Sequence, residues 1–133
     1  MSAAANKQLM QHIFAETAKG NGKPFFEALA DDVVWILTGT TAWSKTYRGK
    51  QAVLDELLGP LRAKLAGTNR IAAHRFIAEG DHVVVEARGN VTTKAGTPYN
   101  NTYCWVCRLA DGKIAELVEY MDTALVAAAL GDP

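Results

Sequence analysis

The sequence predicts an α+β fold in which helices cover one face of a curved antiparallel sheet. Apolar residues recur three and four positions apart in the first half of the chain, as in amphipathic helices. After residue 69 they alternate with polar residues in runs separated by short turns, as in strands. A chain of 133 residues, 49% of them hydrophobic, suits one globular domain, which we expect to span residues 1–133.

About three helices are expected ahead of the long strands. The first covers residues 4–19, where apolar side chains fall on one helical face. Pro24 suits the first turn of a short second helix. A third helix begins at Gly49 and runs toward Gly67, with a kink or break expected at Pro60, because proline cannot donate a backbone hydrogen bond.

The remaining periodic segments predict a short strand followed by a meander. The short strand covers Val33–Leu37, between the second and third helices. The later strands are expected at Ile71–Glu79, His82–Thr92, Tyr99–Leu109 and Ile114–Asp122. Their turns are short enough for antiparallel hairpins. Residues 39–47 lack any periodicity, so we expect a loop there, with Trp43 as a candidate lid.

Charge and N-terminal pattern limit the classes of partner. Fourteen basic and fourteen acidic residues leave no net charge, so the chain lacks the positive surplus that nucleic acids and anionic membranes attract. The N-terminus has no apolar signal segment, and no run approaches the ~18 apolar residues that cross a bilayer. We expect a cytoplasmic protein that binds neither nucleic acid nor membranes.

Cys104 and Cys107 form a C-x-x-C spacing, which in other contexts marks a redox dithiol or half of a zinc site. Aromatic and β-branched neighbours indicate a strand here, and an odd separation sends the two side chains to opposite faces. No histidine stands at ligand spacing, and no glycine-rich phosphate-binding motif occurs. We expect packing thiols, no metal and no cofactor.

Several segments resemble one superfamily. Phe26–Trp35 resembles its approach to the first strand, Tyr47–Val53 its third-helix start, and Asp111–Ile114 with Glu119 and Asp122 its last hairpin. The superfamily is the NTF2-like one, and the closer similarity is to its SnoaL-like, ketosteroid-isomerase-related branch. The resemblance covers nearly the whole chain and implies a cone of strands and helices around a small-molecule pocket. Isomerases, cyclases, dehydratases, epoxide hydrolases and pure binding proteins share this fold, so it selects no reaction.

Two specific activities can be tested against the resemblance. It implies that the general base of a ketosteroid isomerase would fall near Leu37 and its oxyanion-hole tyrosine near Phe14, so authentic steroid isomerisation is not expected. Glu86, Arg88 and Asp122 are the nearest counterparts of the carboxylates and arginine of limonene-type epoxide hydrolases. The order of Glu86 and Arg88 is reversed, and a surface or interface salt bridge is the alternative.

Glu119 and Asp122 are the candidate catalytic carboxylates, because SnoaL-like cyclases are expected to need an acid/base group near the end of the chain. Their opposite phases along the strand place only one of them on the pocket face, unless a bulge shifts the register. Apolar neighbours would raise the carboxyl pKa toward a useful value. Alternatively, Glu119 pairs with Arg75 or Arg88, and Asp122 caps a short C-terminal helix.

Aromatic residues indicate where a ligand would bind. Large flat side chains with a polar tip suit a cavity for an apolar ring, although core packing or a dimer interface is the alternative. The expected substrate-binding residues are Trp35, Trp43, Tyr47, Glu86, Arg88, Asn101, Tyr103 and Trp105. Asn101 supports the set, because an amide between tyrosines needs partners and a ligand can supply one.

The sequence therefore predicts a SnoaL-like protein with a pocket for a small hydrophobic or aromatic molecule and with cofactor-free acid/base chemistry of the isomerase, cyclase or dehydratase type. Two alternatives stay open: a non-catalytic ligand-binding or dimerisation module, and an epoxide-hydrolase-like enzyme. Whether the protein is an enzyme is not decided. We also expect a homodimer, because both faces of the sheet carry apolar residues.

Overall fold

The computed structural model describes residues 1–133 and contains one six-stranded sheet with the strand order β2-β1-β6-β5-β4-β3. The strands are β1 (Leu29–Leu37), β2 (Thr46–Arg48), β3 (Ala72–Glu79), β4 (His82–Arg88), β5 (Thr102–Ala110) and β6 (Lys113–Met121). The helices are α1 (Ala3–Thr17), α2 (Lys23–Ala28), α3 (Lys50–Ala52), the π-helical η1 (Val53–Leu58), α4 (Gly59–Lys64) and α5 (Thr123–Leu130). The predicted α+β class is confirmed.

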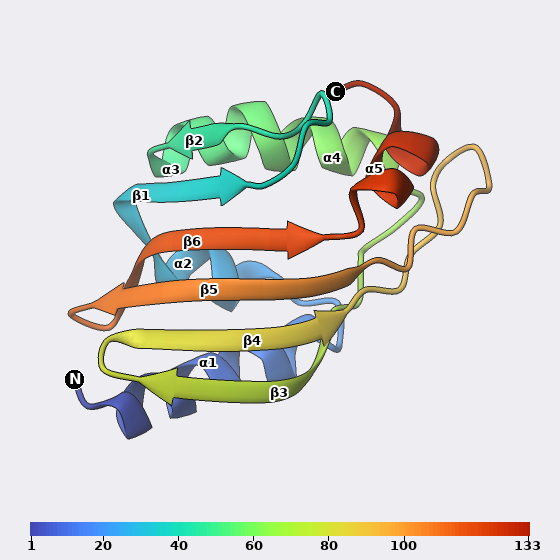
Figure 1. Ribbon diagram of the computed structural model, residues 1–133. Helices are drawn as coiled ribbons and strands as arrows, with labels where there is room; N and C mark the ends of the chain where they lie inside the picture. The colour runs from blue at the N-terminus through green and yellow to red at the C-terminus, as the bar shows by residue number, and fades with distance from the viewer.

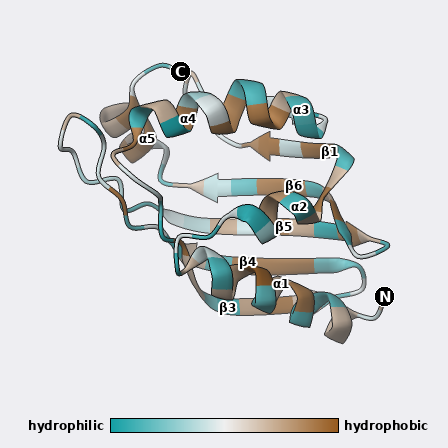
Figure 2. Cartoon of the chain, turned by 180° about the vertical axis from the view of Figure 1, so that it is seen from behind, coloured by the Kyte–Doolittle hydropathy of each residue, from teal (hydrophilic) through white to brown (hydrophobic).

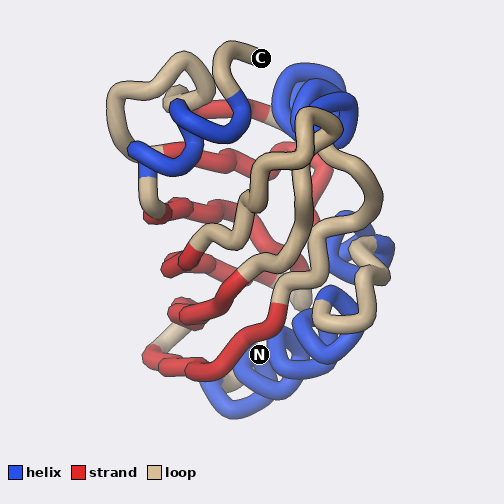
Figure 3. Tube along the Cα trace, turned by 90° about the vertical axis from the view of Figure 1, so that its right-hand side faces the viewer, coloured by secondary structure: helices blue, strands red, loops and turns tan.

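Helices α1, α2 and the helical run from Lys50 to Lys64 lie on one face of the curved sheet, α5 follows the end of β6, and no helix packs over the middle of the other, bare face (Figures 1 and 3). The first helix, α1, begins at Ser2, whose hydroxyl accepts a hydrogen bond from the Ala5 N–H at 3.1 Å. It carries apolar and polar bands (Figure 2) and buries Met10, Ile13 and Phe14 against the β3 and β4 side of the sheet. No helix of the chain is both long and apolar enough to cross a membrane.

The predicted break near Pro60 takes the form of a π-helical segment. The α3, η1 and α4 segments run on without a gap from Lys50 to Lys64. At their junction the Gly59 N–H bonds to the Leu54 carbonyl, five residues back, and a Cβ on Gly59 would lie 3.0 Å from that carbonyl. Proline lacks an N–H and crowds the preceding turn, so a wider turn relieves both problems. Leu57, Leu58 and Leu61 around this turn face the space between the helix and the sheet.

Strand pairing is antiparallel except between β1 and β6, which run parallel. Directly paired residues share a face of the sheet. One row on the helix-covered face crosses five strands in the order Phe76, Val85, Trp105, Glu119 and Leu37. A single carboxyl thus stands in the middle of an apolar row.

Three strand boundaries differ from the expected ones by more than one residue. The first strand begins at Leu29, with an irregular register before Val34. The strand expected at residues 82–92 ends at Arg88, and the next begins at Thr102; between them the Val91 N–H donates to the Asn100 side chain at 3.1 Å. The short β2 was not predicted, since three residues are too few to show an alternation.

Candidate functional site

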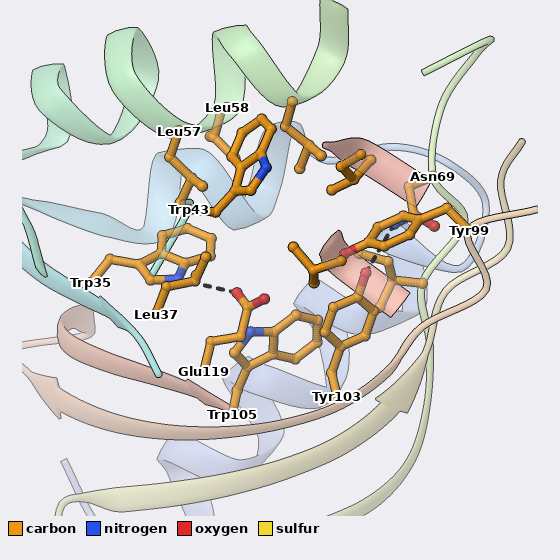
Figure 4. A pocket seen from close by; sticks show the side chains of 14 residues that line it. Trp35, Leu37, Trp43, Leu57, Leu58, Asn69, Tyr99, Tyr103, Trp105 and Glu119 are labelled. Atoms are coloured by element: carbon orange, nitrogen blue, oxygen red, sulfur yellow. Dashed lines mark hydrogen bonds between the residues drawn. The ribbon is translucent and has the colours of Figure 1, made fainter. Parts of the chain in front are cut away.

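The covered face of the sheet and the η1 and α4 helices enclose a cavity with two adjoining chambers. The inner chamber, of about 100 Å³, is lined by Trp35, Leu37, Trp43, Leu57, Leu58, Leu61, Asn69, Ile71, Tyr99, Tyr103, Trp105, Glu119, Val126 and Leu130 (Figure 4). The outer chamber measures about 230 Å³ and is bounded by α1, α2, α4 and the segment that follows α4. Trp35 and Trp105 are among the residues that line both. A void of ~150 Å³ holds benzene, so the two chambers together suit a molecule of one or two rings.

Glu119 is the one charged residue in the lining of the inner chamber, and its side chain is only 8% exposed. Its Oε1 accepts a hydrogen bond from the Trp35 indole N–H at 3.1 Å. Burial raises the pKa of Glu119 to about 7, although the indole N–H groups of Trp105 and Trp35 lower it. Near neutral pH this carboxyl therefore exists in both its acid and its base form.

The register of β6 determines that Glu119 points inward. It lies directly opposite Trp105 on β5 and beside Leu37 on β1. The Thr38 backbone N–H and hydroxyl both donate to the Glu119 carbonyl, at 3.2 and 2.8 Å, which fixes the backbone at this position. A buried strand position between apolar neighbours thus holds the carboxyl away from water.

All three tryptophans of the chain line the inner chamber. Trp43 is 1% exposed, and its indole N–H donates to the Gly131 carbonyl at 2.7 Å. Trp105 stacks on Tyr103 with ring centroids 4.5 Å apart and an interplanar angle of 9°. The Trp105 indole nitrogen is buried and has no hydrogen-bond acceptor with regular geometry.

Two tyrosines supply neutral hydroxyls to the same chamber. Burial raises the pKa of Tyr99 and of Tyr103 and is the main cause of both shifts. Both hydroxyls therefore stay protonated at neutral pH. The Asn69 amide donates to the Tyr103 hydroxyl at 3.4 Å (Figure 4), and the Asn101 amide donates to the Tyr99 hydroxyl at 3.3 Å. These hydroxyls can orient a polar substituent, but they are poor bases.

The structure brings together half of the residues expected at the site. Trp35, Trp43, Tyr103, Trp105 and Glu119 all line the inner chamber. They come from two parts of the chain that are far apart in the sequence: β1 with the loop after it, and β5 with β6.

The other five expected site residues lie away from the cavity lining. Glu86 and Arg88 alternate with the buried residues of β4 and so project from the bare face, where Glu86 pairs with Arg75 at 2.9 Å. Because Arg75 is engaged there, the expected alternative of an ion pair with Glu119 is not formed by this arginine. Tyr47 is buried but lines neither chamber, and its hydroxyl donates to the Trp43 carbonyl at 2.6 Å. Asp122 and Asn101 are the remaining two.

Asp122 caps α5, which is the role expected for it as the alternative to catalysis. Its carboxylate is exposed and accepts from the Leu125 N–H at 3.1 Å. Asn101 is fully buried beside it and bonds to both the backbone N–H and carbonyl of Asp122, at 3.0 and 3.1 Å. Protein groups therefore supply the partners of Asn101 that a ligand was expected to provide.

Several lining residues were not predicted. The sequence predicts an apolar helical face that contains Leu57, Leu58 and Leu61. Pro60 within this helical period is the signal in the sequence for the wide turn that these leucines surround. Asn69 sits in a loop and gives no pattern in sequence.

The two cysteines lie on opposite faces of β5, as the strand prediction requires. Both are free; Cys107 is buried on the helix-covered face, and Cys104 is half-buried. Burial raises the pKa of the Cys107 thiol far above its usual range, so this thiol is unreactive. No group of three or more His, Cys, Asp and Glu side chains is placed to hold a metal ion.

Helices on one face of a curved sheet, with a cavity between the two layers, define the NTF2-like class of proteins. Within that class the chain belongs to the SnoaL-like domain family, whose model matches residues 10–117. The resemblance identified in the sequence is thereby confirmed. No curated protein sequence matches at a significant level.

Solved structures share this fold over nearly the whole chain. An NTF2-like protein from Burkholderia xenovorans is 25% identical, with a TM-score of 0.72 and 98% of each chain covered. A candidate SnoaL-like polyketide cyclase from Jannaschia sp. is 18% identical, with a TM-score of 0.77 and coverage of 98% of this chain and 94% of that one. TerC, crystallised with polyporic acid, is 23% identical, with a TM-score of 0.77 and coverage of 94% and 97%.

Proposed function

We propose that the protein binds a small hydrophobic or aromatic molecule in its two chambers and that Glu119 moves a proton to or from it without a cofactor. The observation that carries this proposal is one carboxyl, with a pKa raised by burial to about 7, in an otherwise apolar and aromatic chamber. General acid/base groups work best when their pKa lies near the working pH. The proposed reaction is of the isomerase, cyclase or dehydratase type.

The other carboxylate expected at the site is not part of this proposal. The engagement of Asp122 as the α5 cap leaves Glu119 as the proton-transfer group. An epoxide-hydrolase-like role is not proposed either, because Glu86 and Arg88 project from the opposite face of the sheet. The neighbours described as a cyclase and crystallised with polyporic acid are consistent with a small organic ligand.

A non-catalytic binding module is the second candidate. It is favoured by one observation: Glu119 has no second carboxylate, lysine or histidine beside it in the chamber lining. Aromatic rings alone suffice to hold a ligand. The two candidate functions differ in one prediction for a bound molecule with an acidic C–H group. An enzyme exchanges the proton of this group with the solvent, and a binding module does not.

2-Tetralone, a two-ring ketone, is the probe that separates them. In D₂O the Glu119 carboxylate removes a proton next to the carbonyl, the resulting carboxylic acid exchanges this proton for a deuteron of the solvent, and the deuteron is then returned to the carbon. We expect the wild type to bind the ketone, seen as quenching of the three chamber tryptophans, and to speed deuterium incorporation measured by proton NMR. Glu119→Gln should retain binding and slow the exchange on the order of 100-fold or more.

Asp122→Asn is the matched control, because it neutralises the neighbouring carboxylate outside the chamber. Exchange by this variant should equal that of the wild type within about twofold. Binding without any exchange by the wild type would support the binding-module candidate. Absence of both binding and exchange would refute the pocket proposal.

We further propose that the bare face of the sheet forms a homodimer. One row of directly paired residues on this face is entirely β-branched and apolar: Ile77, Val84, Val106, Val118 and Ile36. Tyr120, on the same face, is 50% exposed. Contiguous apolar area of this kind is typical of an interface.

Val106→Arg tests the dimer, because Val106 stands at the centre of that row. We expect the wild type to have twice the chain mass in analytical ultracentrifugation and the variant to be monomeric. Thr97→Arg adds the same charge in the β4–β5 loop and should leave the dimer intact. A monomeric wild type at tens of micromolar would contradict this prediction.

We also propose that residues 1–133 form a single domain and that the protein is cytoplasmic. Two free cysteines are compatible with a reducing compartment. Cooperative unfolding with coincident transitions by several probes would support the first, and fractionation of the native host would test the second.

A further inference from the structure

The outer chamber has one charged residue in its lining, Arg62 of α4. No aspartate or glutamate lines this chamber, and no carboxylate of the chain forms an ion pair with the Arg62 guanidinium. The positive charge at the outer chamber is therefore free to bind a group that the protein does not supply.

The uncharged polar side chains of the outer chamber differ in what they bind. The Thr17 hydroxyl donates to the Ile71 carbonyl at 2.7 Å, and the Asn69 side chain is hydrogen-bonded through both its oxygen and its nitrogen. The Thr68 hydroxyl forms no hydrogen bond within the chain. The free polar groups of this chamber, the Arg62 guanidinium and the Thr68 hydroxyl, can both donate to an anion.

Burial shows at which end of the cavity these groups stand. Arg62 and Thr68 are exposed, whereas Trp35 and Trp105, which line both chambers, are 5% and 4% exposed. The guanidinium thus stands at the open side of the outer chamber, with the aromatic rings deeper in. Glu119 is the charged residue of the inner chamber (Figure 4). The cavity therefore has a cation at its mouth and a carboxyl at its inner end.

We propose that the ligand is an aromatic or other hydrophobic carboxylate, whose anionic group binds Arg62 at the mouth while its apolar part fills the chambers. This inference rests on the proposed function and names the class of its ligand. A guanidinium offers two parallel N–H groups that match the two oxygens of a carboxylate. A ligand carboxylate turned inward would instead meet ionised Glu119, and like charges in a buried site repel strongly.

A purely structural role for Arg62 is the alternative. Arg62 and Lys64 both lie in the last turn of α4, where cations interact favourably with the carbonyl end of a helix. Only Arg62 lines a chamber, because Lys64 belongs to the lining of neither. Lys64 is therefore the matched control, with the same charge on the same helical turn but outside the cavity.

The test compares 2-naphthoate with 2-naphthamide, which have the same two rings and differ in charge. Dissociation constants are measured by calorimetry at pH 8 for the wild type, Arg62→Gln and Lys64→Gln. We expect the wild type to prefer the naphthoate by about fivefold, the upper end for an exposed ion pair. Arg62→Gln should abolish this preference, and Lys64→Gln should keep it within about twofold. Added salt should weaken the preference of the wild type.

Glu119→Gln tests the orientation of the bound carboxylate. If the carboxylate stays at the mouth, this substitution changes the dissociation constants of the two compounds by the same factor. A selective gain in affinity for the naphthoate would show that its carboxylate lies beside Glu119. That result would overturn the proposed orientation and with it the role of Arg62.

The outcomes separate this inference from the proposed function. If the wild type does not prefer the naphthoate, or if Arg62→Gln and Lys64→Gln lose the preference equally, the inference is overturned while the binding pocket stands. The same holds if 2-tetralone binds and neither naphthalene compound does. If none of the three compounds binds, the proposed function fails and the inference fails with it. Binding of the naphthamide by each variant shows that its chambers have folded.

Discussion

Glu119→Gln is expected to remove most of the pH dependence of stability between pH 4.5 and about 8. Burial raises the pKa of Glu119 from 4.5 to about 7 in the folded protein. Between these values the folded chain holds a proton that the unfolded chain has released, so the free energy of unfolding falls as pH rises. The loss is complete above the folded pKa. Below pH 4.5 both states are protonated and no loss occurs.

The size of the effect follows from the shift. One pKa unit corresponds to ~1.4 kcal/mol, so the wild type should lose roughly 3 kcal/mol between pH 4.5 and 8. Glutamine has no proton to lose, and the variant should be the more stable protein at pH 8. Urea unfolding at closely spaced pH values measures both curves.

A matched control is Glu27→Gln, which changes an exposed glutamate of α2. Its pH profile should follow that of the wild type. A Glu119→Gln profile parallel to the wild-type profile would show that the buried carboxyl titrates normally. The proposed acid/base role would then lose its main support.

Glu119 could be chosen from the sequence only as one of two candidates. Its phase on the last strand agrees with Leu117, which is buried, and an inward direction follows from that alternation. The pattern could not exclude Asp122, because an aspartate directly before an apolar helical segment is both a good N-cap and a good acid. Only the contact with the Leu125 N–H decides in favour of the cap.

Glu86 and Arg88 could not be assigned to a face because β4 has no clear alternation. The segment from His82 to Arg88 begins with three valines after the histidine, so the two faces of the strand look alike in sequence. The reason is physical: the bare face is itself apolar along one row. The direction of Glu86 depends on pairing with Arg75 and Cys104 across neighbouring strands, which sequence alone does not supply.

The position of the loop after β1 was also beyond sequence reasoning. Trp43 lacks a periodic context, and its place in a loop makes it a candidate lid in the sequence. In the structure it is anchored by contacts with residues that are remote in sequence, above all Gly131. Long-range contacts of this kind leave no local pattern.

Trp43→Ala is expected to lower the free energy of unfolding by about 3 to 5 kcal/mol, the range for large aromatic residues removed from a packed core. Trp43 is 1% exposed, and it lines the inner chamber. Its indole N–H binds the Gly131 carbonyl, and its own carbonyl accepts from the Tyr47 hydroxyl. Loss of the side chain therefore enlarges the chamber and detaches the C-terminal segment from the loop, while the backbone carbonyl keeps its bond with Tyr47. Urea unfolding at pH 5, where Glu119 is mostly protonated, measures this effect alone.

Trp43→Phe separates the ring from the hydrogen bond. Phenylalanine keeps most of the apolar contact but cannot donate to Gly131, so this variant should lose only about 1 to 2 kcal/mol. Hydrogen exchange should then quicken in α5, whose C-terminus is Leu130, and hardly change in α1. A loss below about 1 kcal/mol for Trp43→Ala would mean that the side chain contributes little packing. That result would restore the mobile-lid interpretation, because a lid must leave its site at small free-energy cost for a ligand to enter.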